Sequence, residues 1–240
     1  MPSSIPIIPG AFITEAEAEA YILHGNRPSA EQEDAIVDGI NWATGYMKRS
    51  TGRDLKARTY SMRRTASVTA DAATSRLLAV GAAAAAAMQL VRVGDPVVVS
   101  GLTFPVHAFV TVAWDGAGVT VAGATAVTSG TGGTATFGNG GIIMDGTSMT
   151  GPRTFDLPEC PLKALHAAWW ADGRGGYTAI DIAGAIIEEK IARVTLINDY
   201  WRNGIANLLV EARIGYEEPS GSTAGDPEDY ALLKTISKRL

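Results

Sequence analysis

The residues that most often bind metals or act as nucleophiles are few in this chain and lie far apart. The three histidines, His24, His107 and His166, are isolated, and no two of them have the spacing of a metal site. Cys160 is the single cysteine, which excludes an intrachain disulfide, and we interpret it as a small buried hydrophobe rather than a nucleophile. We expect neither a metal site nor a catalytic thiol.

Two motifs of nucleotide and ester chemistry occur only in incomplete form. Gly130, Gly132 and Ala135 match the dinucleotide-binding fingerprint, but the residues that follow are rich in Thr and Gly. That fingerprint needs a helix whose N-terminus meets the pyrophosphate. The region of Ser148 lacks the second glycine of a nucleophile elbow, and no phosphate loop with Gly-Lys-Ser/Thr occurs. We therefore expect no cofactor.

Carboxylates and tryptophans in the C-terminal half allow two further hypotheses. Asp181, Glu188 and Glu189 could form an acid and base set, although carboxylates on the polar face of a helix are usually solvated. Trp169 and Trp170 could stack on bases, but adjacent residues on a helix point in different directions, which places one of them in the core. Together these patterns predict no catalytic site and a protein that is not an enzyme.

Composition restricts the partners that this chain can have. With 240 residues and 25.1 kDa, it can form one large domain or two smaller ones. A net charge of -5 and a pI near 5.2 argue against a protein that coats nucleic acid. The sequence has neither a Sec-type signal nor an apolar run of ~20 residues, so we expect no membrane contact and a cytoplasmic site of synthesis and use.

Basic residues are unevenly distributed along the chain. No Lys or Arg occurs between Arg92 and Arg153, whereas one short stretch contains Lys48, Arg49, Arg53, Lys56, Arg58, Arg63 and Arg64. This stretch is either a solvated helix end and strand face or a docking patch for an acidic partner or a phosphate backbone. We count Lys48, Arg49 and Arg53 among the expected partner-binding residues.

A long amphipathic helix is predicted from Ile36 to Gly52. Ile36, Ile40, Ala43 and Met47 fall on one face at 3.6 residues per turn, so this face must pack on something. Gly52 can adopt the left-handed conformation that ends a helix.

Capping boxes predict where two helices begin. The Ser29 hydroxyl can accept a hydrogen bond from a free backbone amide while Gln32 reaches back, and this pair precedes the long helix. Thr14 and Glu17 have the same spacing, which predicts a shorter helix over Glu15–Leu23.

Taken in order, these elements resemble the start of the tailed-phage head-tail connector (adaptor) proteins. The segments that carry the resemblance are Phe12–Ala18, Ala43–Met47 and Ser50–Leu55, followed later by Leu157-Pro158, Pro161–Leu165 and Trp169-Trp170. The later segments are similar to a helix of that family that opens after a proline. The resemblance covers about half of the chain and implies a small helical frame that works by assembly.

From Val93 to Thr150 the pattern becomes that of short strands. Apolar runs such as Val97–Val99 alternate with Gly- and Asp-containing turns, and Asp115-Gly116 is a hairpin signal because glycine supplies a positive φ. Short strands at near-regular spacing are typical of a small antiparallel barrel or sandwich. We expect an α+β fold, in which a small helical adaptor frame carries an inserted antiparallel β barrel or sandwich module whose strands pair with one another.

These patterns divide the chain into four parts. We expect a helical part with an extended segment at 1–92, the β module at 93–152, a second adaptor part at 153–218, and a tether with a docking helix at 219–240. The alanine run at 82–87 predicts a short helix. Pro161–Ala171 is typical of a helix, and the runs at 194–201 and 205–214 could form a hairpin, although residues 180–214 suit helix or strand.

The C-terminal segment Asp229–Leu240 predicts a short amphipathic helix on a tether rich in Ser, Gly and Pro. We expect it to be mobile in the free protein and to become ordered against a partner, which the resemblance suggests is the portal. The expected partner-binding residues of this segment are Tyr230, Leu232, Leu233, Ile236 and Leu240.

The resemblance and the residue patterns together predict a structural head-tail adaptor, located in the neck of a virion that assembles in the host cytoplasm. The family implies a homo-oligomeric, dodecameric ring that joins the portal protein to a tail or tail-completion protein. Double-stranded DNA would pass through its channel with non-specific contacts. An acidic protein suits that passage, because attractive contacts with the DNA phosphates would hold the DNA back. The alternative is a hydrolase or a carbohydrate-binding module built on the β segment, where Trp114 is the only tryptophan.

Overall fold

The computed structural model describes residues 5, 7–8, 10–24, 26–53, 55–104, 107–122, 127–146, 153–171, 176–200, 204–218 and 227–240. The chain divides into a helical unit, residues 1–57 and 215–240, and a β unit, residues 58–214. The β unit is therefore inserted into the helical unit. The predicted α+β fold with a β-barrel module is confirmed.

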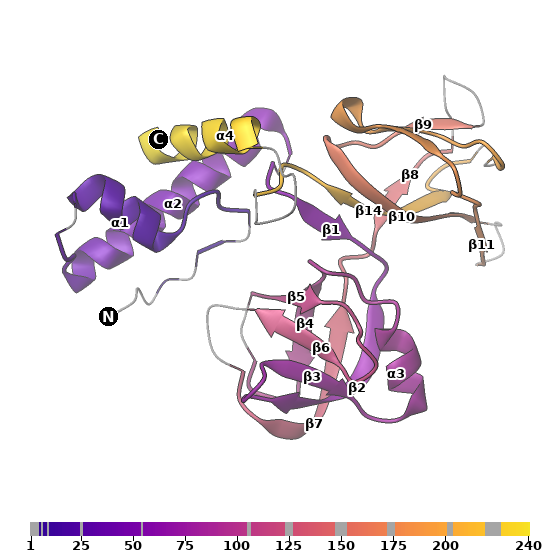
Figure 1. Cartoon of the computed structure of the whole chain (residues 1–240), viewed down its shortest axis with the longest axis horizontal. Helices are drawn as coiled ribbons and strands as arrows, with labels where there is room; N and C mark the ends of the chain where they lie inside the picture. The colour runs from indigo at the N-terminus through magenta and orange to yellow at the C-terminus, as the bar shows by residue number, and fades with distance from the viewer. Residues whose placement is uncertain are drawn as a thin grey trace. The chain divides into compact units, whose positions relative to one another are not determined.

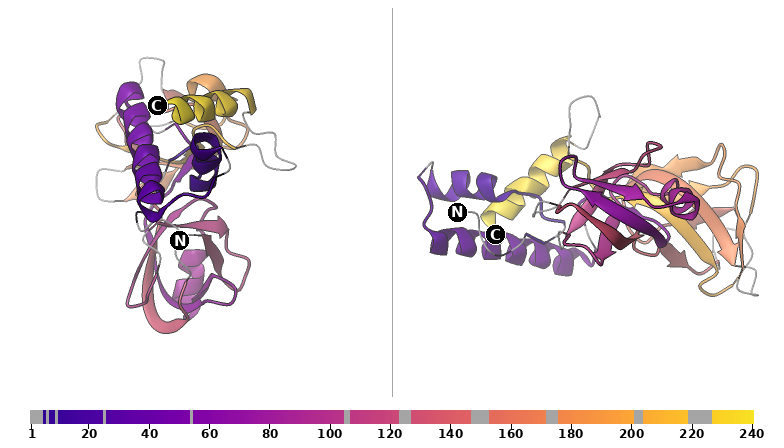
Figure 2. Two further views of the ribbon diagram at one scale, coloured as in Figure 1. Left: turned by 90° about the vertical axis from the view of Figure 1, so that its left-hand side faces the viewer. Right: turned by 90° about the horizontal axis from the view of Figure 1, so that it is seen from below.

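The helical unit contains α1 (Glu15–Leu23), α2 (Ala30–Thr51) and α4 (Pro227–Arg239). Helices α1 and α2 lie side by side (Figure 2), and both begin at the predicted capping boxes, at Thr14 and Ser29. Helix α2 starts directly after Ser29, earlier than its apolar pattern indicated, because the cap rather than the first apolar residue fixes its start. Gly52 ends it with a φ of 70°.

Two apolar clusters form the core of the helical unit. One joins the inner faces of α1 and α2 and consists of Ala11, Ile13, Ala18, Ile36 and Ile40. The other joins the end of α2 to α4 and consists of Phe12, Met47, Leu55 and Tyr230.

The β unit includes a closed six-stranded antiparallel barrel with the strand order β2-β3-β6-β5-β4-β7 (Figure 1). Its strands are β2 (Arg64–Asp71), β3 (Arg76–Ala79), β4 (Pro96–Ser100), β5 (Ala108–Val112), β6 (Val119–Ala122) and β7 (Gly130–Phe137). The predicted alanine-rich helix, α3 (Ala82–Met88), buries Ala84 and Met88 in the barrel core. The predicted turn at Asp115-Gly116 joins β5 to β6, and Gly116 has a φ of 92°.

Among its described residues, the rest of the β unit contains two further sheets and a short 3-10 helix, η1 (Glu189–Ile191). The larger sheet has the order β1 (Arg58–Tyr60), β14 (Leu208–Ile214), β10 (Leu162–Ala171) and β11 (Tyr177–Ala179), and β8 (Ile142–Met144) also pairs with β14. The smaller sheet contains β12 (Ile186–Glu188), β13 (Arg193–Thr195) and β9 (Thr154–Asp156). Strand β14 is almost entirely buried and pairs on both sides.

The predicted limits of the β module, residues 93 and 152, are wrong. Strands β2 and β3 precede residue 93 but complete the barrel, because β2 pairs with β7 and β3 pairs with β6. The strands of 93–150 therefore do not pair only with one another, and β8 pairs with β14 instead. Residues 153–214, assigned to the helical frame, belong to the β unit.

The helix predicted over Pro161–Ala171 is also wrong, because this segment is strand β10. It pairs with β14 from Leu162↔Ile214 to Trp170↔Leu208, with two register shifts. The central strand β14 needs backbone partners on both sides, and this tertiary requirement outweighs the local helical pattern. The hairpin suggested for residues 194–214 does not form either, since β13 pairs with β9 and β12 whereas β14 pairs with β1, β8 and β10.

A buried ion pair ties the start of the barrel to the central strand of the larger sheet. The Arg64 guanidinium lies 2.5 Å from Oε1 of Glu211, whose side chain is fully buried. The same carboxylate oxygen accepts a hydrogen bond from the backbone amide of Met62 at 2.9 Å. Without Arg64, the buried Glu211 charge would keep, among the described residues, only this amide and the more distant Arg92 guanidinium, 4.0 Å from Oε2.

We predict that Arg64→Ala lowers the free energy of unfolding by about 3–5 kcal/mol, the cost of breaking a buried pair from one side. Urea denaturation of the full-length chain measures this loss. Arg63→Ala is the matched control, because Arg63 is exposed, and it should change stability by less than ~0.5 kcal/mol. Equal losses in the two variants would show that the pair does not stabilise the β unit.

Candidate functional site

The predicted docking helix α4 has an inner face that packs within the helical unit. Tyr230 is only 2% exposed, and its ring meets that of Phe12 edge-on at 5.2 Å. Met47 and Leu55 complete the cluster, and Leu233 packs against it partly buried. Tyr230 is therefore not available to a partner in this structure.

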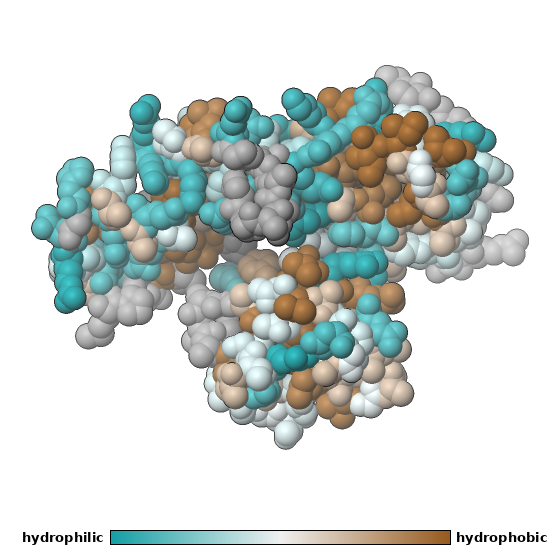
Figure 3. Space-filling view, in the orientation of Figure 1, coloured by the Kyte–Doolittle hydropathy of each residue, from teal (hydrophilic) through white to brown (hydrophobic). Residues whose placement is uncertain are grey.

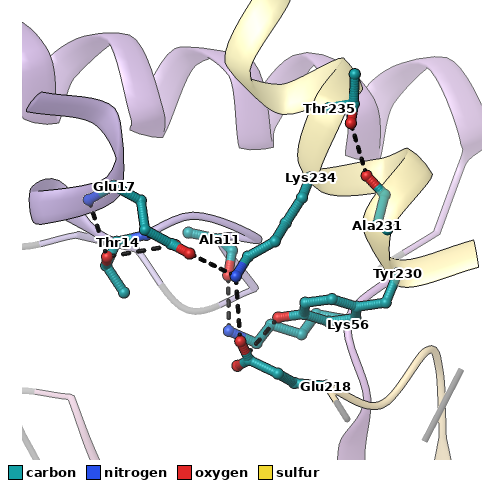
Figure 4. Close-up of polar contacts among 9 residues, drawn as sticks. All are labelled: Ala11, Thr14, Glu17, Lys56, Glu218, Tyr230, Ala231, Lys234 and Thr235. Atoms are coloured by element: carbon teal, nitrogen blue, oxygen red, sulfur yellow. Dashed lines mark hydrogen bonds and ion pairs between the residues drawn. The ribbon is translucent and has the colours of Figure 1, made fainter. Parts of the chain in front are cut away.

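Ionic contacts fix the same face of α4 (Figure 4). The Lys234 ammonium donates to Glu17 of α1 at 2.6 Å and to Glu218 at 3.2 Å. The hydrogen bond to Glu17 raises the pKa of Lys234. Burial alone would raise the pKa of Glu17, but the Lys234 bond and the Thr14 amide outweigh it, so the pKa is lowered. Both members of the pair stay charged near neutral pH.

A second lysine secures the segment that leads into α1. Lys56 donates to the carbonyl of Ala11 at 2.7 Å, and burial lowers the pKa of its ammonium (Figure 4). The Tyr230 hydroxyl donates to Glu218 at 3.4 Å, and burial raises the pKa of this tyrosine. The expectation that α4 becomes ordered only against a partner is thus wrong, because its inner face has apolar and ionic contacts within the chain. The tether at 219–226 lies outside the described residues.

The outer face of α4 keeps the remaining predicted anchors available. Leu232 is 58% exposed, and Ile236 and Leu240 are also exposed. The predicted basic residues lie at the end of α2, where Lys48 and Arg49 are exposed and Arg53 is half-buried. Of the predicted residues, Tyr230 and Leu233 therefore face the core, Arg53 is half-buried, and the exposed ones are Leu232, Ile236, Leu240, Lys48 and Arg49.

An apolar groove of about 720 Å³ opens among α1, α2 and the end of α4. Ile13, Ala18, Ile36 and Ile40 line its depth, and these residues belong to the core of the helical unit. Its rim carries Tyr21, Ile22, Gln32, Asp38, Trp42, Lys238, Arg239 and Leu240. Ser237 also lines the groove, and its buried hydroxyl has no hydrogen-bond partner among the described residues.

One wall of this groove is a second apolar face of α2 that sequence reasoning missed. Trp42 is 52% exposed and Tyr46 is 45% exposed, and their rings stack with centroids 5.5 Å apart. Ala35 and Gly39 lie on the same face and are exposed. The sequence contains the helical spacing of this face, because its residues follow one another at intervals of four, three and four. It was missed because only the more apolar inner face of the same helix was considered.

A different apolar surface lies on the β unit. On the face in Figure 3, apolar side chains gather over the region labelled β9 in Figure 1. The exposed isoleucines of the smaller sheet and its connections are Ile186, Ile187, Ile191 and Ile197. A group of exposed aliphatic side chains of this size is more typical of an interaction surface than of a surface that stays in contact with solvent.

The residues considered for chemistry remain scattered. His24 ends α1 in the left-handed conformation, His107 lies before β5, and His166 lies half-buried in β10. Burial and nearby Arg92 lower the pKa of His166. In the described part of the chain, no group of three or more His, Cys, Asp or Glu side chains is arranged to hold a metal ion.

The other candidate sites lie in contexts that do not suit their proposed roles. Gly130, Gly132 and Ala135 lie within strand β7 of the barrel rather than in a strand-turn-helix unit. Glu189 pairs with Lys163, and Asp181 accepts the amide of Ala183 in a turn.

The remaining aromatic, thiol and hydroxyl candidates are also placed in the β unit. Trp169 and Trp170 are partly buried in β10, and Trp114 packs against the barrel core. Cys160 is half-buried before a cis proline, and Ser148 lies outside the described residues.

Comparison of the chain with models of known protein families, with curated proteins and with solved structures finds no match. None of the described helices is long and apolar enough to cross a membrane.

We predict that Tyr230→Ala lowers the free energy of unfolding of the helical unit by about 3 kcal/mol, because a buried aromatic ring is removed. Thermal melting followed by circular dichroism measures the change. Leu232→Ala on the outer face of the same helix is the matched control, and it should shift the melt only slightly. Equal shifts in the two variants would contradict the packing of α4 described above.

Proposed function

We propose that this chain is the structural head-tail adaptor of a tailed bacteriophage. It forms a homo-oligomeric ring that joins the portal protein to the tail or a tail-completion protein and lets DNA pass. The chain acts by assembly in the neck of the virion and uses no cofactor.

The observation that carries this proposal is that each of the two units has its own exposed apolar surface. The helical unit presents the outer face of α4 and the groove beside α2, and the β unit presents the isoleucines around the smaller sheet. A connector must bind different neighbours on different surfaces, and exposed apolar patches are the surfaces on which stable contacts form.

Three of the segments that resemble the adaptor family support the same proposal. Phe12–Ala18 leads into and begins α1, Ala43–Met47 lies within α2, and the residues up to Leu55 surround the end of α2. These three segments lie in the helical unit, whereas the later segments, between Leu157 and Trp170, lie in the β unit, where strand β10 replaces the expected helix, so they do not support the resemblance. This unit is therefore the proposed site of portal contact.

Within the helical unit, the outer face of α4 is the proposed portal-binding surface. Leu232 and Ile236 lie one turn apart there and are exposed, while the inner face of the helix already packs on α1 and α2. A preformed helix loses less conformational entropy on binding than a flexible arm, so fewer apolar anchors are needed. Lys48 and Arg49 are exposed at the end of α2, and their positive charge suits acidic groups of the portal.

We predict that Leu232→Glu/Ile236→Glu weakens binding to assembled portal by about tenfold or more, because two apolar anchors become charged. Biolayer interferometry with immobilised portal measures the affinity. Val98→Glu is the matched control, since Val98 is an exposed apolar residue of the barrel, and it should bind like the original chain. Undiminished binding by the α4 variant, with a normal melt, would remove this surface from the proposal.

A further inference from the structure

The outer face of α2 has a pattern that is complementary to itself. Ala35, Gly39, Trp42 and Tyr46 form an exposed stripe, with the small residues towards the N-terminus and the stacked aromatic residues towards the C-terminus. At 100° per residue, Glu31 and Arg49 fall on the same face, one at each end of the stripe. When a second copy of the helix runs in the opposite direction, its aromatic residues lie opposite the small residues of the first, and its basic end lies opposite the acidic end of the first.

We propose that this face binds the same face of a second copy of the chain, with the two α2 helices antiparallel about a two-fold axis. The axis passes close to residues 40 and 41. Gly39 then faces Trp42 of the second copy, and Ala35 faces Tyr46 of the second copy. Each such contact occurs twice, as an isologous interface requires.

The space for the second copy is present in the monomer. A Cβ added to Gly39 would meet no atom within 4 Å, so the large Trp42 ring of a second copy can lie against this point of the helix. The apolar groove extends the contact, because Tyr21 and Ile22 of α1 and Leu240 after α4 flank the stripe. Helices whose contact residues are small approach each other more closely, which improves packing.

Charge selects the antiparallel arrangement. Glu31 and Arg49 are exposed, and their side chains make no hydrogen bond or ion pair with other described residues. In the antiparallel pair, Glu31 of each copy lies next to Arg49 of the other, so two intermolecular ion pairs flank the aromatic centre. A parallel pair would place like charges side by side, which is unfavourable.

The size of the surface indicates the strength of the pairing. The half-exposed residues Tyr21, Ile22, Trp42, Tyr46 and Leu240 offer on the order of 500 Å² of apolar area per copy, below the ~800 Å² of a standard interface. We therefore expect a dimer with a micromolar dissociation constant. This pairing goes beyond the adaptor role, because it uses the outer face of α2 and leaves the outer face of α4 uncovered; Arg49 is the residue assigned to both contacts.

Charge reversal in the full-length chain tests the pairing, with sedimentation equilibrium over a series of concentrations as the measurement. Glu31→Arg alone and Arg49→Glu alone should each raise the dimer dissociation constant about tenfold or more, since each places like charges together twice. The double variant Glu31→Arg/Arg49→Glu should restore the original dissociation constant to within about threefold, because it recreates both ion pairs.

Gly39→Leu provides an independent test with two readouts of opposite sign. Replacing a mid-helix glycine should raise the melting temperature of the monomer, since the site is open and leucine favours a helix. The same change should raise the dimer dissociation constant about tenfold or more, because the new side chain occupies the place of Trp42 of the second copy.

Three results would overturn the proposal. They are a chain that remains monomeric at hundreds of micromolar, a double charge variant no better than the single ones, and a Gly39→Leu variant that dimerises as the original chain does. Portal binding is measured separately with the monomeric Glu31→Arg and Gly39→Leu variants, which leave the proposed portal-binding residues unchanged, so loss of the dimer and loss of the adaptor function can be distinguished.

Discussion

The helical unit depends on the meeting of two chain segments that the whole β unit separates in sequence. Lys56 and Tyr216 form a parallel bridge, and Tyr216 exchanges backbone hydrogen bonds with Leu55 and Ala57 at 2.8 and 3.0 Å. Gly215 makes this approach possible, because with a φ of 111° its added Cβ would lie 2.7 Å from the backbone of Ala57. Loop-closure entropy grows only slowly with length, so a large folded insertion between closely placed ends is tolerated.

From this junction follow the position of α4 and the surfaces that the helical unit presents. The chain leaves the junction through Glu218, whose carboxylate accepts a hydrogen bond from Lys234 of α4. Helix α4 then buries Tyr230 against Phe12. Once that inner face is covered, Leu232 and Ile236 can only point outward, since they lie on the other side of the helix. The same packing leaves the outer face of α2 uncovered beside the groove.

Local signals predicted those parts of the fold that local interactions control. The capping boxes at Thr14 and Ser29 and the glycine end at Gly52 fixed two helices, because caps satisfy backbone groups within a few residues. The barrel limits were missed because β2 buries only the small residues Ala66, Val68 and Ala70, which give a weak alternating pattern. Strand β10 was missed because its conformation is set by β14, a partner distant in sequence.

The candidate surfaces were predictable to a similar extent and for the same reason. The amphipathic pattern of residues 229–240 correctly predicted a helix, but a pattern with apolar residues on two sides does not reveal which side the rest of the chain covers. Tyr230 therefore belongs to the core and Leu232 to the surface, a distinction that rests on the position of Phe12 and Met47. The stripe from Ala35 to Tyr46 could have been found from its spacing alone.

Exposed apolar surfaces on both units are the central physical support for an adaptor that works by assembly. The most direct test is the native mass of the full-length chain at micromolar concentration, alone and after mixing with assembled portal. An adaptor predicts a discrete complex whose mass equals that of the portal plus a complete ring of copies. Unchanged masses of portal and free chain, at concentrations where both are folded, would contradict the proposed function.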